Sequence, residues 1–139
     1  MQARLGHIAT VYEHSMYVFG GWDGVSCLDD LYQYSFPTNI WYEVRRTSGE
    51  RPCPRYRHDA LVYEKKMFIF GGVDQNKKRF NDLFSFNFES REWMQIITHG
   101  CLPTPRTFHK FINSFNLLFI VGGYDGERKG DVYTLVIDK

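Results

Sequence analysis

Residues 16–24 read MYVFGGWDG, residues 67–74 read MFIFGGVD and residues 118–126 read LFIVGGYDG. In each stretch an apolar run ends in a glycine pair, and the three pairs follow one another at steps of 51 residues. An apolar run without polar alternation predicts a strand that is covered on both faces. A fixed period of about 50 residues predicts a repeat architecture.

Other residue types around the glycine pairs keep the same period. Before each apolar run comes an arginine followed three residues later by a histidine, in RLGH, RYRH and RTFH, and after each glycine pair comes an aspartate at a constant offset. A further aspartate begins the next segment at Asp30, Asp82 and Asp131, with steps of 52 and 49 residues that indicate loops of variable length. Such interleaving predicts three copies of one structural unit.

Each unit reads as four short extended segments. The apolar strand is preceded by HIATVY, HDALVY or HKFINSF and followed by DDLYQYSF, NDLFSFNF or GDVYTLVI. A fourth segment, IWYEV or EWMQII, carries a tryptophan, and we expect turns between segments, among them one at Asn113 and Ser114. Four antiparallel strands per unit are typical of propeller blades. The aromatic residues, which make up 17% of the chain, are then expected to fill the space between blades.

The combined pattern resembles the kelch repeat, in the variant with GxxPxPRxxH at the start of a unit. GERPCPR at 49–55, GCLPTPR at 100–106, and DDLY or NDLF after the glycine pair carry the resemblance, which covers essentially the whole chain. It implies an all-β fold of about three kelch-type β-propeller blades, each a four-stranded antiparallel sheet, in a partial propeller or arc. We expect blade 1 at residues 1–47, blade 2 at 48–98 and blade 3 at 99–139, where the fourth strand is missing.

Closed propellers have about four to eight blades. The first unit here lacks the GxxPxP lead-in, and the third lacks the tryptophan-bearing segment. Two alternatives follow: these blades belong to a longer kelch chain, or several copies complete a ring by oligomerisation. The first is favoured, because an open arc exposes blade faces and an unpaired edge.

Residues that recur once per blade indicate architecture, because equivalent positions a blade apart do not converge on one metal ion. The glycine spacing also differs from the GxGxxG phosphate loop. We therefore expect no metal and no cofactor. The residues interpreted as structural are Arg4, His7, Gly20, Gly21, Trp41, Arg55, His58, Gly71, Gly72, Trp93, Arg106, His109, Gly122 and Gly123.

The units differ most in the segment after each glycine pair and at the two positions between the arginine and the histidine. In kelch-like propellers these segments line one rim of the disc, where partners usually bind, so the resemblance implies a partner-binding rim. The positions after the glycine pairs are Trp22, Gln75, Asn76, Lys77, Lys78, Arg79, Tyr124, Arg128 and Lys129. Those at the start of a blade are Tyr56, Arg57, Thr107 and Phe108.

Charge is uneven along the chain although the total is only +1. Residues 1–44 carry one base and five acids, for a charge of −4, and the remainder carries +5. A partly basic rim favours an acidic peptide, since arginine pairs with carboxylates in a bidentate way. The asymmetry could equally serve attraction between neighbouring blades. The near-neutral total argues against a nucleic-acid partner.

The leading interpretation is a non-catalytic protein–protein interaction module, as in adaptor and scaffold proteins such as ubiquitin-ligase substrate adaptors. Alternatives are a structural scaffold in the cytoskeleton or another large assembly, and a metal-dependent oxidase on a kelch-like propeller. No Ser-His-Asp order, CxxC or HExxH pattern supports an enzyme. Three cysteines without a CxxC pair favour a cytoplasmic or nuclear location, and the longest apolar stretch, 117–121, is too short to span a membrane.

Overall fold

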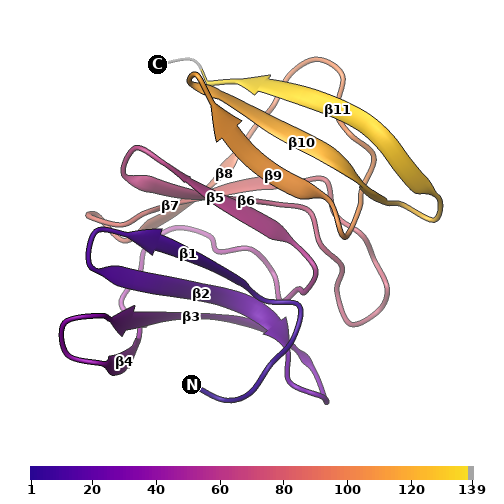
Figure 1. The fold of residues 1–139 in the computed structure, drawn as a ribbon. Helices are drawn as coiled ribbons and strands as arrows, with labels where there is room; N and C mark the ends of the chain where they lie inside the picture. The colour runs from indigo at the N-terminus through magenta and orange to yellow at the C-terminus, as the bar shows by residue number, and fades with distance from the viewer. Residues whose placement is uncertain (138–139) are drawn as a thin grey trace.

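The computed structural model describes residues 1–137 and contains only β-strands, in three antiparallel sheets. Figure 1 shows the sheets stacked in chain order, with the indigo N-terminal sheet at one end and the yellow C-terminal sheet at the other. The all-β architecture of antiparallel sheets expected from the sequence is therefore confirmed, with four strands in blades 1 and 2 and three in blade 3. Residues 138 and 139, which the sequence analysis placed in blade 3, lie outside the described residues.

Each sheet lies within one of the three sequence units, and its strands pair in chain order. Blade 1 contains β1 (Ile8–Tyr12), β2 (Ser15–Trp22), β3 (Cys27–Ser35) and β4 (Ile40–Glu43). Blade 2 contains β5 (Asp59–Tyr63), β6 (Lys66–Phe70), β7 (Leu83–Asn87) and β8 (Glu92–Ile96). Blade 3 contains β9 (Lys110–Ser114), β10 (Leu117–Tyr124) and β11 (Arg128–Val136). The first strands lie side by side, β5 against both β1 and β9.

Large aromatic side chains fill the space between blades 1 and 2. Trp93 on β8 is 1% exposed and packs against Phe19 of blade 1 and Phe86 of blade 2, with ring centroids 5.2 and 4.8 Å away. Tyr12 stacks on Phe88 across the same interface at 4.3 Å. The expectation that aromatic residues fill the space between blades is confirmed. Trp41, in contrast, packs on Tyr34 of its own blade.

Each repeated arginine holds a loop of its own blade. The Arg55 side chain, 1% exposed, donates to both carboxylate oxygens of Asp82 at 2.5 and 3.0 Å and to the carbonyl of Gly71 at 3.0 Å. Arg4 makes the same contacts with Asp30 and Gly20, and Arg106 makes them with Asp131 and Gly122. The arginine therefore joins the start of each blade to the end of its second strand and the start of its third.

The repeated histidines join neighbouring blades. Nε2 of His58 lies 3.0 Å from the carbonyl oxygen of Phe19, and Nε2 of His109 lies 2.8 Å from that of Phe70. Both Nδ1 atoms lack a hydrogen-bond partner among the described residues, so the geometry fits neutral rings that donate from Nε2. His7, the blade 1 counterpart, is exposed and makes no such bond within residues 1–137.

The first glycine of each pair leaves room for this interblade contact. A Cβ atom at Gly71 would lie 2.6 Å from Cε1 of His109, and one at Gly20 would lie 2.9 Å from Cε1 of His58. Both glycines have positive φ, 73° and 68°, which side chains disfavour. Within residues 1–137 no later blade covers Gly122, where an added Cβ would approach only the carbonyl oxygen of Lys129.

Two local features differ from the repeat pattern. In blades 1 and 3 the second strand continues through the glycine pair with a register shift, whereas β6 stops at Phe70. The expected turn at Asn113 and Ser114 is wrong. Those residues end β9, and the turn is formed by Phe115 and Asn116, which have φ of 50° and 63°.

Candidate protein-interaction site

The segments that vary between blades meet at one rim of the stack. In each blade the segment before the first strand pairs with the residue that follows the glycine pair, through the bridges Leu5 to Trp22, Tyr56 to Val73 and Thr107 to Tyr124. The variable residues at the start of a blade thereby lie next to the loop between its second and third strands. This pairing explains why two segments about 17 residues apart form one surface.

Aromatic rings and guanidinium groups alternate along this rim. Trp22 lies 5.7 Å from Tyr56, and the Arg57 guanidinium lies 4.9 Å from the Tyr56 ring and 4.6 Å from the Phe108 ring. Arg79 of blade 2 covers the Tyr124 ring of blade 3 at 5.0 Å. The cation–π contacts link the rims of blades 2 and 3, and the ring contact between Trp22 and Tyr56 links those of blades 1 and 2.

Two residues of this row have an unfavourable backbone conformation. Gly6, Arg57 and Phe108 occupy the same position, one residue before the repeated histidine, with φ of 65°, 58° and 59°. Glycine adopts this conformation without strain, whereas a residue with a side chain is disfavoured by about 1–2 kcal/mol. Phe108 is nevertheless 62% exposed, so burial of its ring in a core does not offset this cost. Blades 2 and 3 thus present large side chains at a position suited to glycine.

A groove of about 220 Å³ lies between the rims of blades 2 and 3. Val73, 7% exposed, contributes an apolar surface, and three cations and three aromatic rings contribute most of the remainder. A second, open recess of about 560 Å³ shares Phe108 and Tyr124 with it. The groove residues are Tyr56, Arg57, Val73, Lys77, Arg79, Thr107, Phe108 and Tyr124.

The aspartates near the rim are engaged by hydrogen bonds within their own blades. Asp74 accepts hydrogen bonds from the backbone N–H groups of Asn76 and Lys78 at 2.9 and 2.8 Å. Asp125 accepts from the Thr104 hydroxyl at 2.6 Å and from the Glu127 N–H group, and these bonds and Lys129 lower its pKa to about 2. The Asp23 carboxylate likewise accepts from two backbone N–H groups, which lowers its pKa.

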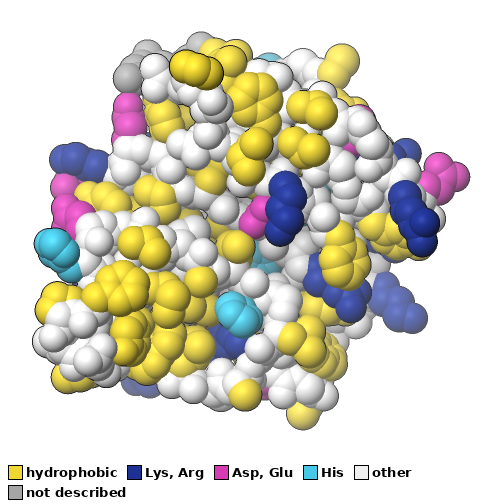
Figure 2. All heavy atoms as spheres, in the orientation of Figure 1, with side chains coloured by type: hydrophobic (Ala, Val, Ile, Leu, Met, Phe, Trp, Pro, Cys, Tyr) yellow, Lys and Arg dark blue, Asp and Glu magenta, His cyan; other side chains and the backbone are white. Residues whose placement is uncertain are grey.

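The groove cations are not paired with these carboxylates. Among the described residues, Arg57, Lys77 and Arg79 make no salt bridge. The groove therefore combines unneutralised positive charge with exposed aromatic surface. Figure 2 shows dark blue Lys and Arg side chains beside yellow hydrophobic ones on the right of the view, the side on which Figure 1 draws the turn between β10 and β11.

The structure groups some of the residues predicted at the rim and separates others. Seven of them line the groove, Trp22 adjoins it through Tyr56, and Arg128 lines the neighbouring recess. Gln75 and Asn76 instead line a separate recess with Cys27 and Cys53, while Lys78 lies over the Phe80 ring and Lys129 pairs with Asp125. Thr107 is 3% exposed, so it contributes mainly backbone to the groove. Val73 was not anticipated, although it lies within a segment singled out as variable.

The described residues contain no group of three or more His, Cys, Asp or Glu side chains that could hold a metal ion. Among residues 1–137 no helix is long and apolar enough to cross a membrane. Within the same range all three cysteines are free, Cys27 buried and Cys53 and Cys101 exposed.

Comparison with known proteins agrees with this geometry. Residues 1–139 match the family described as the KLHDC2/KLHL20/DRC7 Kelch-repeats domain. The chain is 37% identical over 139 residues to the leucine-zipper-like transcriptional regulator 1 homolog of Drosophila melanogaster, covering 95% of this chain and 14% of that protein. It is 33% identical over 129 residues to the Rho GTPase-activating protein gacHH of Dictyostelium discoideum, covering 88% and 8%. It is 30% identical over 138 residues to kelch domain-containing protein 10 of Rattus norvegicus, covering 94% and 34%.

The chain thus spans from 8% to 34% of the length of these relatives, which are named as varied proteins. Kelch repeats are in general protein-interaction modules and not catalysts. The repeated arginines, histidines and glycine pairs, the three stacked sheets and the match over residues 1–139 agree with one another. The chain belongs to the kelch-repeat family.

Proposed function

We propose that this chain is a non-catalytic interaction module whose rim groove binds an acidic segment of a partner protein, in the manner of an adaptor or scaffold. The observation that carries the proposal is the groove itself, where Arg57, Lys77 and Arg79 lie among exposed aromatic rings without a carboxylate partner. Arginine is suited to this role because its planar guanidinium pairs with a carboxylate through two parallel hydrogen bonds.

The neighbouring rings add apolar contact and orient the cations. Arg57 is held between Tyr56 and Phe108, so less side-chain entropy is lost when it pairs with a ligand. Tyrosine and arginine are also enriched among the residues that dominate binding energy at interfaces. The groove is therefore expected to recognise an acidic residue that lies beside an apolar one, and not charge alone.

To test this, peptides that bind the immobilised protein are selected from a library of random displayed peptides. The affinity of the protein for the enriched peptides is then measured. Enrichment of Asp and Glu is expected. The triple variant Arg57→Glu, Lys77→Glu and Arg79→Glu should reduce the affinity for these peptides at least tenfold. A control with the same change in charge, Arg45→Glu, Arg46→Glu and Lys65→Glu, alters cations that do not line the groove. Equal affinities for the two triple variants would refute the assignment.

We also propose that a further blade packs on blade 3, supplied by a longer kelch chain or by another copy. The support is that Gly20 and Gly71 are each covered by the histidine of the next blade, whereas Gly122 is not covered within residues 1–137. An intracellular location, cytoplasmic or nuclear, is proposed as well, because free and exposed thiols such as those of Cys53 and Cys101 are typical of reducing compartments.

A further inference from the structure

Two of the three cysteines line one recess between the rims of blades 1 and 2. Cys27 begins β3 of blade 1, and Cys53 lies in the segment that leads into blade 2. Backbone contact holds these segments together, since the Arg55 N–H group donates to the Leu28 carbonyl at 3.1 Å. The volume of about 230 Å³ admits a small solute, because one water molecule requires only about 10–15 Å³. The recess is lined by Cys27, Cys53, Pro54, Asp74, Gln75 and Asn76.

Cys53 stands where the other two blades have a polar side chain that joins two parts of the blade. Its position, two residues before the repeated arginine, holds Gln2 in blade 1 and Thr104 in blade 3. The Gln2 amide donates to the Asp23 carboxylate at 3.1 Å, and the Thr104 hydroxyl donates to the equivalent aspartate of blade 3 at 2.6 Å. Among the described residues, Cys53 donates no such bond to the loop of blade 2. The repeat therefore does not account for a thiol at this position.

Cys27 also departs from the repeat. In each blade its position pairs with the residue that follows the glycine pair, and it holds Cys27 in blade 1, Arg79 in blade 2 and Arg128 in blade 3. Arginine in the other two blades shows that the architecture does not require a small apolar side chain there. Both departures are cysteines and both line the same recess, which indicates a role for the thiols that packing does not explain.

The two thiols differ in how readily they meet a reagent. Cys53 is exposed, and its sulfur accepts a hydrogen bond from the Arg55 guanidinium at 3.4 Å. Cys27 is only 9% exposed, and burial, together with the charge of Asp74, raises the pKa of its thiol. Because the thiolate is the reactive form, Cys53 is the thiol that a reagent from solution attacks first.

We propose that Cys53 and Cys27 are a redox pair, which a hydroperoxide converts to a disulfide between blades 1 and 2. Transient disulfides of this kind occur in reducing compartments, where they usually serve redox sensing. The disulfide ties the start of β3 to the segment that leads into blade 2. The redox pair is independent of the proposed rim groove, because the recess and the groove share no lining residue.

The reaction has two steps. With hydrogen peroxide, the Cys53 sulfur attacks one peroxide oxygen, the O–O bond breaks, and the products are a sulfenic acid at Cys53 and one water molecule. The Cys27 sulfur then attacks the sulfenic sulfur, an S–S bond forms, and the S–O bond breaks as the oxygen leaves as a second water molecule. The two thiols are thus oxidised to a disulfide, and one peroxide is reduced to two water molecules.

The test is treatment of the 139-residue protein with an equimolar amount of hydrogen peroxide, followed by peptide mapping without reduction. We expect a link between Cys27 and Cys53 within one chain, a loss of two hydrogen atoms in mass, and reversal by dithiothreitol. The link should form at least about tenfold faster in the folded protein than in protein unfolded in urea, because the fold holds the two thiols close together. In urea, links that include Cys101 should form as well.

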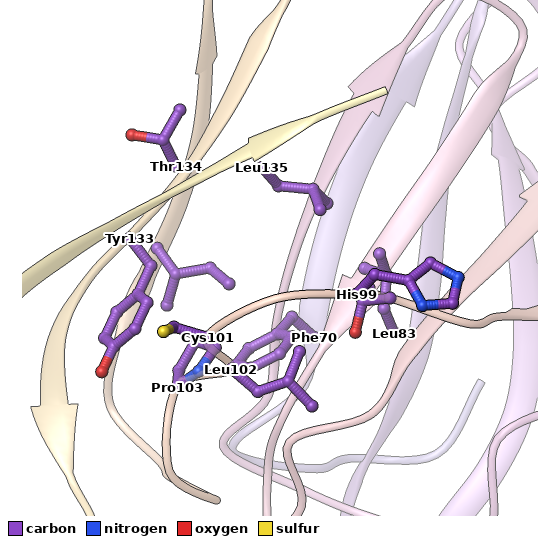
Figure 3. A pocket seen from close by; sticks show the side chains of 11 residues that line it. Phe70, Leu83, His99, Cys101, Leu102, Pro103, Tyr133, Thr134 and Leu135 are labelled. Carbon is purple, nitrogen blue, oxygen red and sulfur yellow. The ribbon is translucent and has the colours of Figure 1, made fainter. Parts of the chain in front are cut away.

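Variants assign the role of each cysteine. Cys27→Ser should stop Cys53 at the sulfenic acid, which dimedone captures. Cys53→Ser should slow oxidation of the Cys27 thiol at least about tenfold, because that thiol is buried. Cys101→Ser is the matched control and should leave the link unchanged. Cys101 is exposed too, but it lines a different cavity, where Figure 3 shows it with Pro103 and Tyr133.

Peptide maps of the unaltered protein decide the matter even if a variant does not fold. A folded protein that links Cys53 to Cys101 or to a second copy overturns the proposal. Oxidation of Cys53 to the sulfinic acid while Cys27 stays free overturns it as well. Equal rates for the link in folded and unfolded protein would show that the fold does not position the two thiols for this reaction.

Discussion

Replacing Asp82 with asparagine tests how much the ion pair between Arg55 and Asp82 contributes to the stability of the protein. Arg55 is 1% exposed and donates to both Asp82 carboxylate oxygens, whereas the Asp82 side chain is 21% exposed. Removing one partner of a fully buried ion pair typically costs about 3–5 kcal/mol, because the other charge is left uncompensated. Here water reaches the carboxylate, and Arg55 keeps its hydrogen bonds to the carbonyls of Gly71 and Cys53. We therefore expect Asp82→Asn to lower the free energy of unfolding by about 2–3 kcal/mol.

The assay is equilibrium unfolding in urea, followed by tryptophan fluorescence and circular dichroism. The midpoint should fall without a change in slope, since the surface exposed on unfolding is the same. Asp131→Asn, in the more exposed pair of blade 3, should have a smaller effect, and Glu50→Gln on the surface should stay within about 0.5 kcal/mol of the unaltered protein. An Asp82→Asn protein as stable as the Glu50→Gln control would show that the ion pair between Arg55 and Asp82 does not stabilise the blade.

Three further predictions follow from the interblade contacts and the rim. Burial lowers the pKa of His58 to about 3 and that of His109 to about 4. The unfolded chain, with histidine pKa values near 6.5, takes up protons first as the pH falls, so the free energy of unfolding should hold above pH 6.5 and fall by about 1 kcal/mol per histidine at pH 5.5. Urea titrations should show a weaker pH dependence for the double variant His58→Gln, His109→Gln, and an unchanged dependence would refute the assignment. Gly71→Ala places a Cβ 2.6 Å from His109 and should destabilise the protein more than Gly24→Ala, whose Cβ meets nothing within 4 Å, by about 1 kcal/mol or more in thermal or urea unfolding. Arg57→Gly and Phe108→Gly should leave stability unchanged or raise it by up to about 1 kcal/mol while weakening binding of acidic peptides, and a loss of stability in both would show that the side chains serve the fold.

The repeat made much of the fold predictable from the sequence. Residues such as Arg55 and His58 recur at a fixed period, so their structural role follows from repetition even though their partners lie far away in the chain. The partners themselves were not predictable, because the His58 contact with the Phe19 carbonyl depends on how one sheet stacks on the next. The turn before β10 was misplaced since Asn113 and Ser114 have typical turn composition, whereas Phe115, which has φ of 50° and is 95% exposed, does not.

The sequence predicted which segments contribute to the candidate groove, but not which residues of those segments lie together. Variation between blades pointed to residues 73–80, and the structure divides that segment, with Lys77 and Arg79 at the groove and Gln75 and Asn76 in another recess. The division arises because the Asp74 carboxylate folds the loop by accepting two backbone hydrogen bonds, an effect of local geometry that composition does not reveal.

The position before each repeated histidine separates the requirements of the fold from those of binding. All three blades keep the same positive φ there, so the architecture requires that backbone conformation, and Gly6 supplies it without strain. Arg57 and Phe108 satisfy the same backbone at a cost of about 1–2 kcal/mol and gain contacts mainly with each other and with Tyr56 at an exposed rim. A cation between two rings, one of which is 62% exposed, returns only about 0.5–1 kcal/mol, which is less than the strain of two such residues. The stability of the whole fold offsets the remainder, as it does at other non-glycine residues with positive φ such as Glu13 and Phe115. Under the proposed function, the exposed side chains of Arg57 and Phe108 contribute to binding of a partner at the groove.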